Sequence, residues 1–232
     1  MATTQASDAE RTRLSKAVVI DRALAIGDAE GLDAVTIRRL AADLGVTPMA
    51  LYWHFRNKDE LLAGLADRLW SEIDINVDAT ADWPDQLRGL LDSLVHVLRA
   101  HPAATGLLLE GEKRTSDAAQ AAIETTLEVL HRGGLNPEYA ASIARSALFT
   151  GIMLVMSEPG KEPGMSPAEQ AEHTRQMRVR LALLPPERFP RTIEAAGPLT
   201  ACDDPEFHYR FGIDMFIAGV RAMAARQPAD GE

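Results

Sequence analysis

A small polar residue followed directly by proline recurs along this chain of 232 residues. The polar residue can supply an N-cap oxygen, and proline suits the first turn of a helix because its missing N–H would have no partner there. The pairs are Thr47-Pro48, Asn136-Pro137, Ser166-Pro167 and Asp204-Pro205. No period-two alternation bounded by turn residues is evident. The pattern predicts an all-α fold.

Glycines mark helix ends as clearly as these pairs mark helix starts. Gly31, Gly45 and the pair Gly133-Gly134 follow periodic segments, where glycine can adopt the left-handed conformation that ends a helix. Pro84 and Pro102 open two further helices. The punctuation predicts helices near 15–30, 36–44, 47–55, 58–75, 84–100, 102–110, 116–132, 137–157, 167–183, 187–196 and 205–225.

Bulk composition limits the class of protein. Hydrophobic residues make up 46% and charged residues 25% of the chain, which is ordinary for a soluble globular protein. No run of apolar residues approaches the roughly 18 needed to cross a bilayer, and residues 1–10 lack the apolar region of a secretory signal. Cys202 is the single cysteine, so an intrachain disulfide is excluded. We therefore expect a cytoplasmic protein that does not contact a membrane.

Residues 36–55 have the pattern of two short helices joined by a tight turn. One helical face is formed by residues spaced i, i+3, i+4 and i+7: Ile37, Leu40, Ala41 and Leu44. Thr36 can cap the first helix, Gly45 can end it, and Thr47 can cap the second. A close crossing of the helices requires a small residue at Ala41 and an apolar anchor such as Leu51. The pattern therefore predicts a helix-turn-helix.

The second helix carries polar and aromatic side chains outside the face that packs against the first helix. Leu51 and Phe55 are four residues apart and can pack inward together. The helix start and outer faces carry Thr47, Pro48, Met49, Ala50, Tyr52, Trp53 and His54. In helix-turn-helix proteins the first residues of the second helix reach base edges in the major groove. We expect apolar contacts to thymine methyl groups, hydrogen bonds to phosphates or bases, and a phosphate contact from Lys58.

Charge is distributed unevenly between this segment and the remainder of the chain. The whole chain has a formal net charge of −10. Residues 36–58 contain four basic residues and one acidic residue, a net charge of +3, which leaves −13 elsewhere. A basic segment on an acidic body favours docking of that segment alone on DNA. The alternative is an ordinary helical hairpin with its aromatic residues in the core, but four consecutive residues, 52–55, cannot all face inward.

The stretch 14–62, which includes VTIRRLAADLGVTPMALYWHFRNKDELL, resembles the DNA-binding domain of the tetracycline repressor (TetR) family. The resemblance implies an all-helical homodimer with a small DNA-binding domain and a larger ligand-sensing domain. It also implies release from a palindromic operator, which is double-stranded DNA, when a small-molecule effector binds. By position, it implies DNA contacts from Thr36, Arg38, Thr47, Pro48, Met49, Ala50, Tyr52, Trp53, His54 and Lys58.

Two later segments, HRGGLNPEYA and FHYRFGIDMFIAGVRA, resemble the tetracycline repressor subfamily. That subfamily binds a magnesium–tetracycline complex through a histidine and a glutamate. The corresponding positions here fall near Leu109 and Met156, and neither residue can take the part of those ligands. This departure argues against magnesium and tetracycline, and we expect neither a metal site nor a cofactor.

The expected domain organisation follows from these segments. Residues 1–13 are expected to form a disordered arm, and 14–62 a helix-turn-helix domain whose linking helix runs to about 75. Residues 76–226 are expected to form a helical ligand-binding and dimerisation domain, and 227–232 a disordered tail. Within the larger domain, the helices over 137–157 and 205–225 are apolar on several faces.

Those two helices can form either the core of the monomer or a four-helix dimer interface, and the residue pattern alone does not decide between the two. The resemblance favours a dimer, with Phe207, Phe211 and Met215 at the interface. A pocket for a largely apolar effector is expected from Leu94, Leu98, Leu109, Phe149, Met153, Met156 and Met177, although any of these can instead be plain core.

No catalytic constellation is visible. His96 and His101 are five residues apart, which does not place them on one helix face, and no metalloprotease, phosphate-loop or nucleophile-elbow motif occurs. A helical enzyme or carrier would need such a constellation, and an architectural module would not need a basic helix with exposed aromatics. The sequence therefore predicts a ligand-responsive transcription regulator with no catalytic residue, most simply a repressor, with activation left open.

Overall fold

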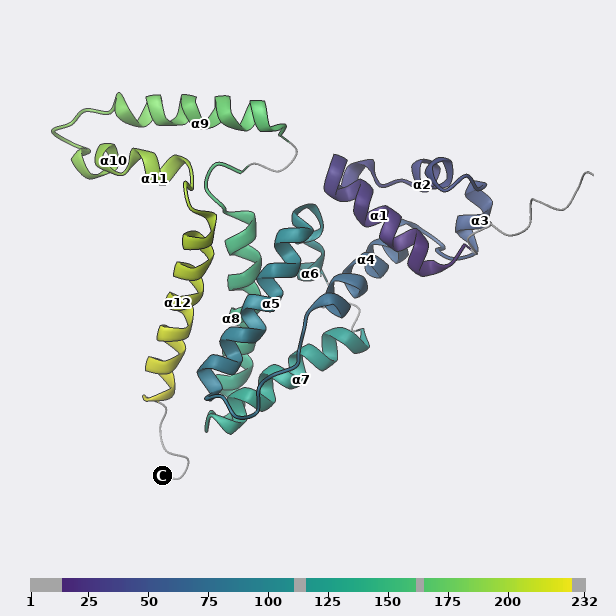
Figure 1. Ribbon diagram of the computed structural model, residues 1–232, viewed down its shortest axis with the longest axis horizontal. Helices are drawn as coiled ribbons and strands as arrows, with labels where there is room; N and C mark the ends of the chain where they lie inside the picture. The colour runs from purple at the N-terminus through teal and green to yellow at the C-terminus, as the bar shows by residue number, and fades with distance from the viewer. Residues whose placement is uncertain (1–13, 111–115, 162–164, 227–232) are drawn as a thin grey trace, which may run out of the picture.

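The computed structural model describes residues 14–110, 116–161 and 165–226, and within them it contains helices and no strand (Figure 1). The all-α prediction is therefore confirmed. The expected disordered arm and tail, 1–13 and 227–232, lie outside the described residues.

Five short elements form the N-terminal unit. They are α1 (Lys16–Glu30), the 3-10 turn η1 (Leu32–Ala34), α2 (Ile37–Asp43), α3 (Pro48–Tyr52) and α4 (Lys58–Glu72). Capping side chains start four of them: Ser15, Thr36, Thr47 and Asn57 each accept a hydrogen bond from a backbone N–H three residues later. The packed centre includes Val19, Leu40, Leu51, Phe55 and Leu61, all nearly inaccessible to solvent.

The larger C-terminal part is a helical bundle with an appended lobe. The bundle consists of α5 (Trp83–Ala100), η2 (Pro102–Ala104), α6 (Leu107–Glu110), α7 (Asp117–Arg132), α8 (Pro137–Met156) and α12 (Pro205–Ala224). Helix α5 packs against α7, α8 and α12, and α8 also packs against α7 and α12. The lobe consists of α9 (Pro167–Ala182), α10 (Pro190–Glu194) and α11 (Ala196–Thr200), and Figure 1 shows it projecting beyond the bundle.

Two glycines allow the bundle helices to approach closely. A Cβ at Gly151 of α8 would lie 2.7 Å from Leu94 Cδ2 of α5. A Cβ at Gly212 of α12 would overlap the Leu154 side chain of α8. The three helices therefore pack through glycine at their crossings, which leaves the opposite sides of α8 and α12 to carry larger side chains.

Several observed bounds differ from the expected ones. Helix α3 ends at Tyr52 rather than 55, although the Phe55 N–H still donates to the Leu51 carbonyl at 2.9 Å, which keeps Phe55 beneath the helix. The segment expected to be one helix over 187–196 divides into α10 and α11. Pro198 follows this break and lacks the N–H needed to continue the hydrogen-bond ladder from α10.

Helix α8 also changes the expectation that no segment approaches the length of a membrane span. By length and composition alone it could cross a membrane, and a third of its apolar window is buried. The expectation considers only uninterrupted apolar runs. Glu138 and Arg145 interrupt such a run in α8, but its average hydropathy stays as high as that of a membrane-spanning helix. Core helices of soluble proteins meet the same criterion.

Candidate nucleic-acid interface

The turn between α2 and α3 has the geometry that the sequence predicts. Gly45 has a φ of 65°, in the left-handed region that favours glycine. The Val46 N–H donates to the Ala41 carbonyl at 2.9 Å, which closes the turn. Ala41 and Leu51 are both buried, and α2 packs against α3, as expected for a small residue and an apolar anchor at a close crossing.

Helix α3 presents its expected recognition side chains to solvent. Trp53 is 86% exposed, Met49 67% and Tyr52 49%, whereas Phe55 is 1% exposed. Thr47 and Pro48 are exposed as well, and Ala50 and His54 are half-buried. One aromatic residue of the 52–55 run therefore belongs to the core, and the others lie on the outer surface. A duplex could reach this surface without any rearrangement of α3.

The basic side chains around α3 differ in their partners. Arg39 forms two ion pairs within the chain, with Nη2 2.7 Å from Glu30 Oε1 and Nε 3.3 Å from Asp43 Oδ1. Arg38 and Lys58 are exposed and form no ion pair with any residue that the structure describes. Thr36 is exposed at the start of α2, where its Oγ1 accepts from the Arg39 N–H. Of these three basic side chains, Arg38 and Lys58 are therefore the ones whose charge is available to phosphates.

Asp43 ties the exposed helix α2 to α1. Its Oδ2 accepts a hydrogen bond from Arg22 Nε at 2.8 Å, across 21 residues of sequence. This hydrogen bond, with the positive charges of Arg22 and Arg39, holds the pKa of the Asp43 carboxyl below its ordinary value. The acidic residue of the segment thus keeps a negative charge that positions two arginines instead of repelling DNA.

The segment between α3 and α4 is also fixed by a carboxylate. Glu60 Oε2 accepts from the Arg56 backbone N–H at 2.8 Å, and Lys16 Nζ lies 3.6 Å from Glu60 Oε1. The backbone hydrogen bond and the nearby cations lower the pKa of Glu60. Arg56 itself is exposed beside Lys58. The sequence shows only that Arg56 adds positive charge to the segment, and its exposed position makes it a further candidate for a phosphate contact.

The residues expected to line an effector pocket fall into two groups. Leu94 and Leu98 are buried in α5. Leu109, Phe149, Met153 and Met156 are exposed, and Met177 is half-buried on α9. One cavity of about 490 Å³ lies between α1 and α4, and another of about 410 Å³ lies along α9. Neither cavity is lined by these seven residues, so the pocket stays a prediction.

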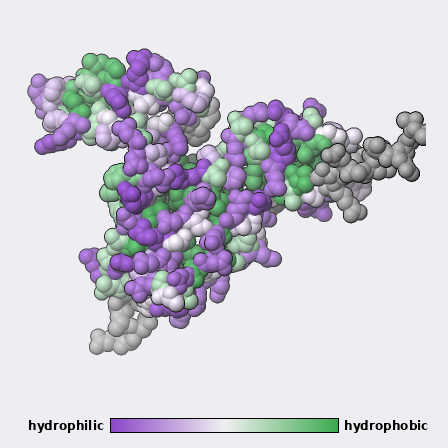
Figure 2. Space-filling view, in the orientation of Figure 1, coloured by the Kyte–Doolittle hydropathy of each residue, from purple (hydrophilic) through white to green (hydrophobic). Residues whose placement is uncertain are grey.

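Exposed apolar side chains follow both α8 and α12. Phe207, Phe211 and Met215 are 52%, 56% and 64% exposed, and the Phe207 and Phe211 rings stack with centroids 5.6 Å apart. Phe149, Met153 and Met156 continue this character on α8. Figure 2 shows hydrophobic surface interleaved with hydrophilic surface over the bundle. Among the described residues, no group of three or more His, Cys, Asp or Glu side chains is placed to hold a metal ion.

Family models match both parts of the chain. Residues 19–65 match the model described as bacterial regulatory proteins, tetR family. Residues 77–224 match the model described as tetracyclin repressor-like, C-terminal domain. The two matches together cover the helix-turn-helix unit and the bundle with its lobe.

Curated relatives and solved structures are similar over nearly the whole chain. Tetracycline repressor protein class D from Escherichia coli is 30% identical over 212 residues, which are 89% of each chain. The HTH-type transcriptional repressor DrrR1 of Streptomyces coeruleorubidus is 26% identical over 90% of this chain and 78% of its own length. The Streptomyces coelicolor protein ActR, solved with actinorhodin, is 29% identical with a TM-score of 0.74, over 91% of this chain and 98% of that one.

Proposed function

Because the chain belongs to the TetR family of bacterial regulatory proteins, we propose that it is a dimeric repressor that leaves a palindromic operator when a small, largely apolar effector binds. Its relatives are transcription regulators, and the chain is accordingly a DNA-binding regulator. We assign no catalytic role to any residue. We place its action in the cytoplasm, where a bacterial operator lies.

The observation that carries the DNA-binding role is the contrast between the two faces of α3. Leu51 and Phe55 anchor the helix from beneath, while Met49, Tyr52 and Trp53 stand exposed. Several large apolar side chains exposed within one short helix are typical of an interaction surface. Methyl groups of thymine and the sugar edges of the major groove would cover them in a complex.

The proposed DNA contacts divide by chemistry. Base contacts come from the start and outer face of α3, and phosphate contacts come from the flanking hydroxyl and cationic groups. The full set is Thr36, Arg38, Thr47, Pro48, Met49, Ala50, Tyr52, Trp53, His54 and Lys58. The proposal that residues 14–62 form the DNA-binding domain, with α4 as linking helix, rests on the packing of α1 to α4.

We propose an apolar effector because all seven residues expected to line its pocket have apolar side chains. The solved relative ActR binds actinorhodin, which supports a small organic effector for this chain. Several curated relatives are named tetracycline repressors, but Leu109 and Met156 of this chain offer no oxygen ligand for magnesium. We therefore propose an effector held mainly by apolar contact, and residues 76–226 as its binding domain.

The proposed homodimer joins α8 and α12 of two copies in a four-helix interface. Each helix carries an exposed apolar stripe, and neighbouring helices of the same chain already cover its opposite side. A two-fold interface of this kind brings identical stripes together. It also gives a rigid base from which two α3 helices can reach successive major grooves.

Selection of bound duplexes from a random DNA pool tests the function. We expect a palindrome whose half-sites are separated by about 10 base pairs or a multiple of that spacing, since two copies of α3 must enter the same side of the duplex. Titrations of the selected duplex should show at least ~1000-fold preference over unrelated DNA at moderate salt. Equal affinity for every duplex and for other polyanions would remove the proposed function.

The effector is tested separately with the selected duplex in hand. A panel of apolar aromatic compounds should contain members that both raise the melting temperature and weaken operator binding. Charged, strongly hydrophilic compounds of similar size serve as the matched controls. Release only by the hydrophilic compounds would contradict an apolar pocket while leaving the DNA-binding role intact.

A further inference from the structure

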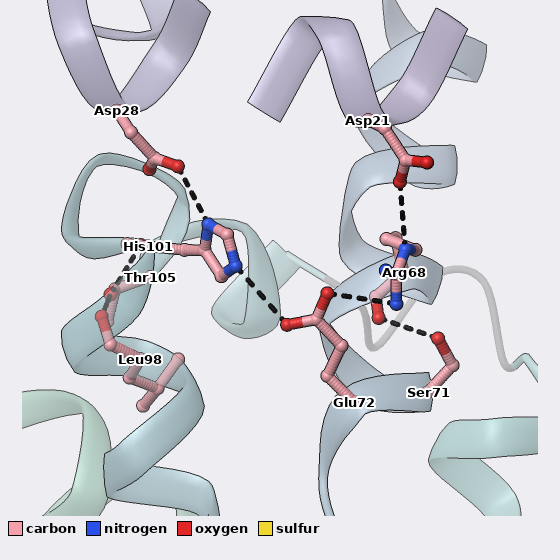
Figure 3. A network of polar contacts seen from close by, with 8 residues as sticks. All are labelled: Asp21, Asp28, Arg68, Ser71, Glu72, Leu98, His101 and Thr105. Atoms are coloured by element: carbon pink, nitrogen blue, oxygen red, sulfur yellow. Dashed lines mark hydrogen bonds and ion pairs between the residues drawn. The ribbon is translucent and has the colours of Figure 1, made fainter. Parts of the chain in front are cut away.

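The imidazole of His101 lies between two carboxylates that come from two different helices (Figure 3). Nδ1 is 2.8 Å from Asp28 Oδ2 in the last turn of α1, and Nε2 is 3.2 Å from Glu72 Oε2 at the end of α4. His101 is itself the C-cap residue of α5. One side chain therefore joins the first helix of the DNA-binding unit, the linking helix and the first helix of the bundle.

This junction contains few other charged groups. On α4, Arg68 Nη1 lies 2.9 Å from Glu72 Oε1, and Arg68 Nε lies 3.0 Å from Asp21 Oδ1 of α1. On the side of η2, the neutral Thr105 donates to the His101 carbonyl at 3.2 Å. The charged groups around the imidazole are thus Asp28 from α1 and Glu72 with its partner Arg68 from α4, which together leave the imidazole facing net negative charge (Figure 3).

The contact of His101 with Asp28 has a distinctive place in the fold. Within the described ranges, no other side-chain hydrogen bond or ion pair connects α1, α2 or α3 with the bundle. Apart from this hydrogen bond, α1 meets the bundle by packing against η2, where Ala104 is 1% exposed. The hydrophobic effect has no preferred direction, whereas a hydrogen bond favours one alignment of donor and acceptor. This hydrogen bond therefore adds a directional contact to the packing that α1 and α4 make with the bundle.

Both ring nitrogens face oxygens that can only accept while the carboxylates are ionised. A neutral imidazole donates through one nitrogen and presents a lone pair at the other, so one of the two carboxylates would oppose that lone pair. A protonated imidazolium donates through both nitrogens and satisfies both carboxylates with charge-assisted hydrogen bonds. Histidine is the side chain that ordinarily changes charge between pH 5 and 8. The two-sided geometry is thus complete only in the protonated form.

We propose that His101 is a proton-dependent clasp, which fixes the DNA-binding unit on the bundle and strengthens operator binding as the pH falls. The effect on DNA rests on the proposed function. A dimer must place two α3 helices in the duplex at once, at a separation of roughly 34–36 Å. Freedom of each unit relative to the dimer core is lost on binding and weakens affinity. A closed clasp removes that freedom before DNA arrives.

A distance measurement tests the clasp without DNA. A nitroxide on Ala42→Cys, in a background with Cys202→Ser, places one label on the exposed side of α2 in each copy of a dimer. Pulsed electron resonance should give a narrower distance distribution at pH 6 than at pH 8. His101→Phe should give the broad distribution at both pH values, and the matched control His96→Phe, on the exposed side of the same helix, should keep the response. A width that does not change with pH when His101 is present overturns the clasp.

Operator titrations at equal ionic strength test its consequence. The unaltered protein should bind the selected duplex about fivefold more tightly at pH 6 than at pH 8. His54 also faces the proposed DNA surface, so the relevant quantity is the difference between the unaltered protein and His101→Phe, which should retain less than half of the pH effect. Asp28→Asn and Glu72→Gln keep the shape of the junction and should reduce the effect in the same way.

The two levels of inference fail differently. An identical pH effect in the unaltered protein and in all three junction variants overturns the clasp while specific DNA binding stands. Absence of specific binding at every pH removes the proposed function instead, and in that case the label distances still show whether the clasp closes.

Discussion

Arg38 and Arg39 are neighbours in α2, yet only one of them is held by its own chain. The Arg39 guanidinium lies 2.7 Å from Glu30 and 3.3 Å from Asp43, whereas Arg38 forms no ion pair with any described residue. Adjacent residues of a helix point about 100° apart, so one arginine faces α1 and the other faces away. Only Arg38 has its full set of donors available for phosphate oxygens.

Replacement of each arginine by alanine should therefore have different effects on DNA binding. Arg38→Ala is expected to weaken binding to all duplexes and to lower the slope of log K against log salt by about one. Lys58→Ala should act in the same way. Arg39→Ala should leave that slope nearly unchanged. Anisotropy titrations at four or more salt concentrations measure the slopes, and an equal loss in Arg39→Ala would show that its ion pairs open on DNA.

Tyr52 and Phe55 provide a second contrast, because both are aromatic and only Phe55 is buried. Tyr52→Ala or His54→Ala should reduce operator affinity by about 1–3 kcal/mol while the melting temperature stays close to that of the unaltered protein. Phe55→Ala should instead destabilise the DNA-binding unit by about 3–5 kcal/mol. Calorimetry and operator titration of the same samples separate the two outcomes. Unfolding of Tyr52→Ala would place its side chain in the core and end its recognition role.

Asp43 should make the stability of the folded protein decrease at low pH. Its pKa is lowered from 3.8 in the folded protein, chiefly by the hydrogen bond from Arg22, so the ionised form favours folding. That contribution is complete above the unfolded value and is lost as the pH falls through the lower folded value. Asp43→Asn should therefore lower the melting temperature at pH 7, with the difference from the unaltered protein shrinking below about pH 4.

The control for this acid effect is Asp203→Asn, at an exposed aspartate without a hydrogen bond or ion pair in the described structure. Its melting temperature should follow that of the unaltered protein at every pH. A constant difference between Asp43→Asn and the unaltered protein from pH 7 to pH 2.5 would mean that the carboxylate charge does not stabilise the fold.

Local signals in the sequence predicted most helix starts, because a cap acts over three residues. Thr36, Thr47, Asn136, Ser166 and Asp204 all accept the expected capping hydrogen bond. The helix-turn-helix was equally predictable, since Ala41, Gly45 and Leu51 meet within ten residues of one another. Both predictions depend on contacts that are close in sequence, where spacing determines geometry.

Contacts between distant residues could not be predicted in this way. Asp28 and Glu72 lie 73 and 29 residues from His101, and nothing in their spacing indicates that they meet. Periodicity also shows that α8 has several apolar faces without showing which of them neighbouring helices cover. Leu94 and Phe149, for example, are equally apolar in the sequence, although Leu94 is buried and Phe149 is 45% exposed. The packing of whole helices decides such cases, and a single sequence does not encode it in a readable pattern.

The exposed stripe on α12 leads to the last prediction, which concerns assembly. Phe211 is 56% exposed, and its ring stacks on Phe207. In the proposed interface a glutamate at this position would place a charge among the apolar side chains of both copies. Phe211→Glu should therefore shift the protein from dimer to monomer at micromolar concentration, measured by sedimentation equilibrium. Ile123→Glu is the matched control, because Ile123 is 43% exposed on α7, outside the proposed interface, and this variant should remain dimeric.

The Phe211→Glu monomer should keep its helical content yet lose operator binding, since one α3 helix alone contacts a single half-site. A dimer that survives Phe211→Glu would place the interface on another face of the bundle.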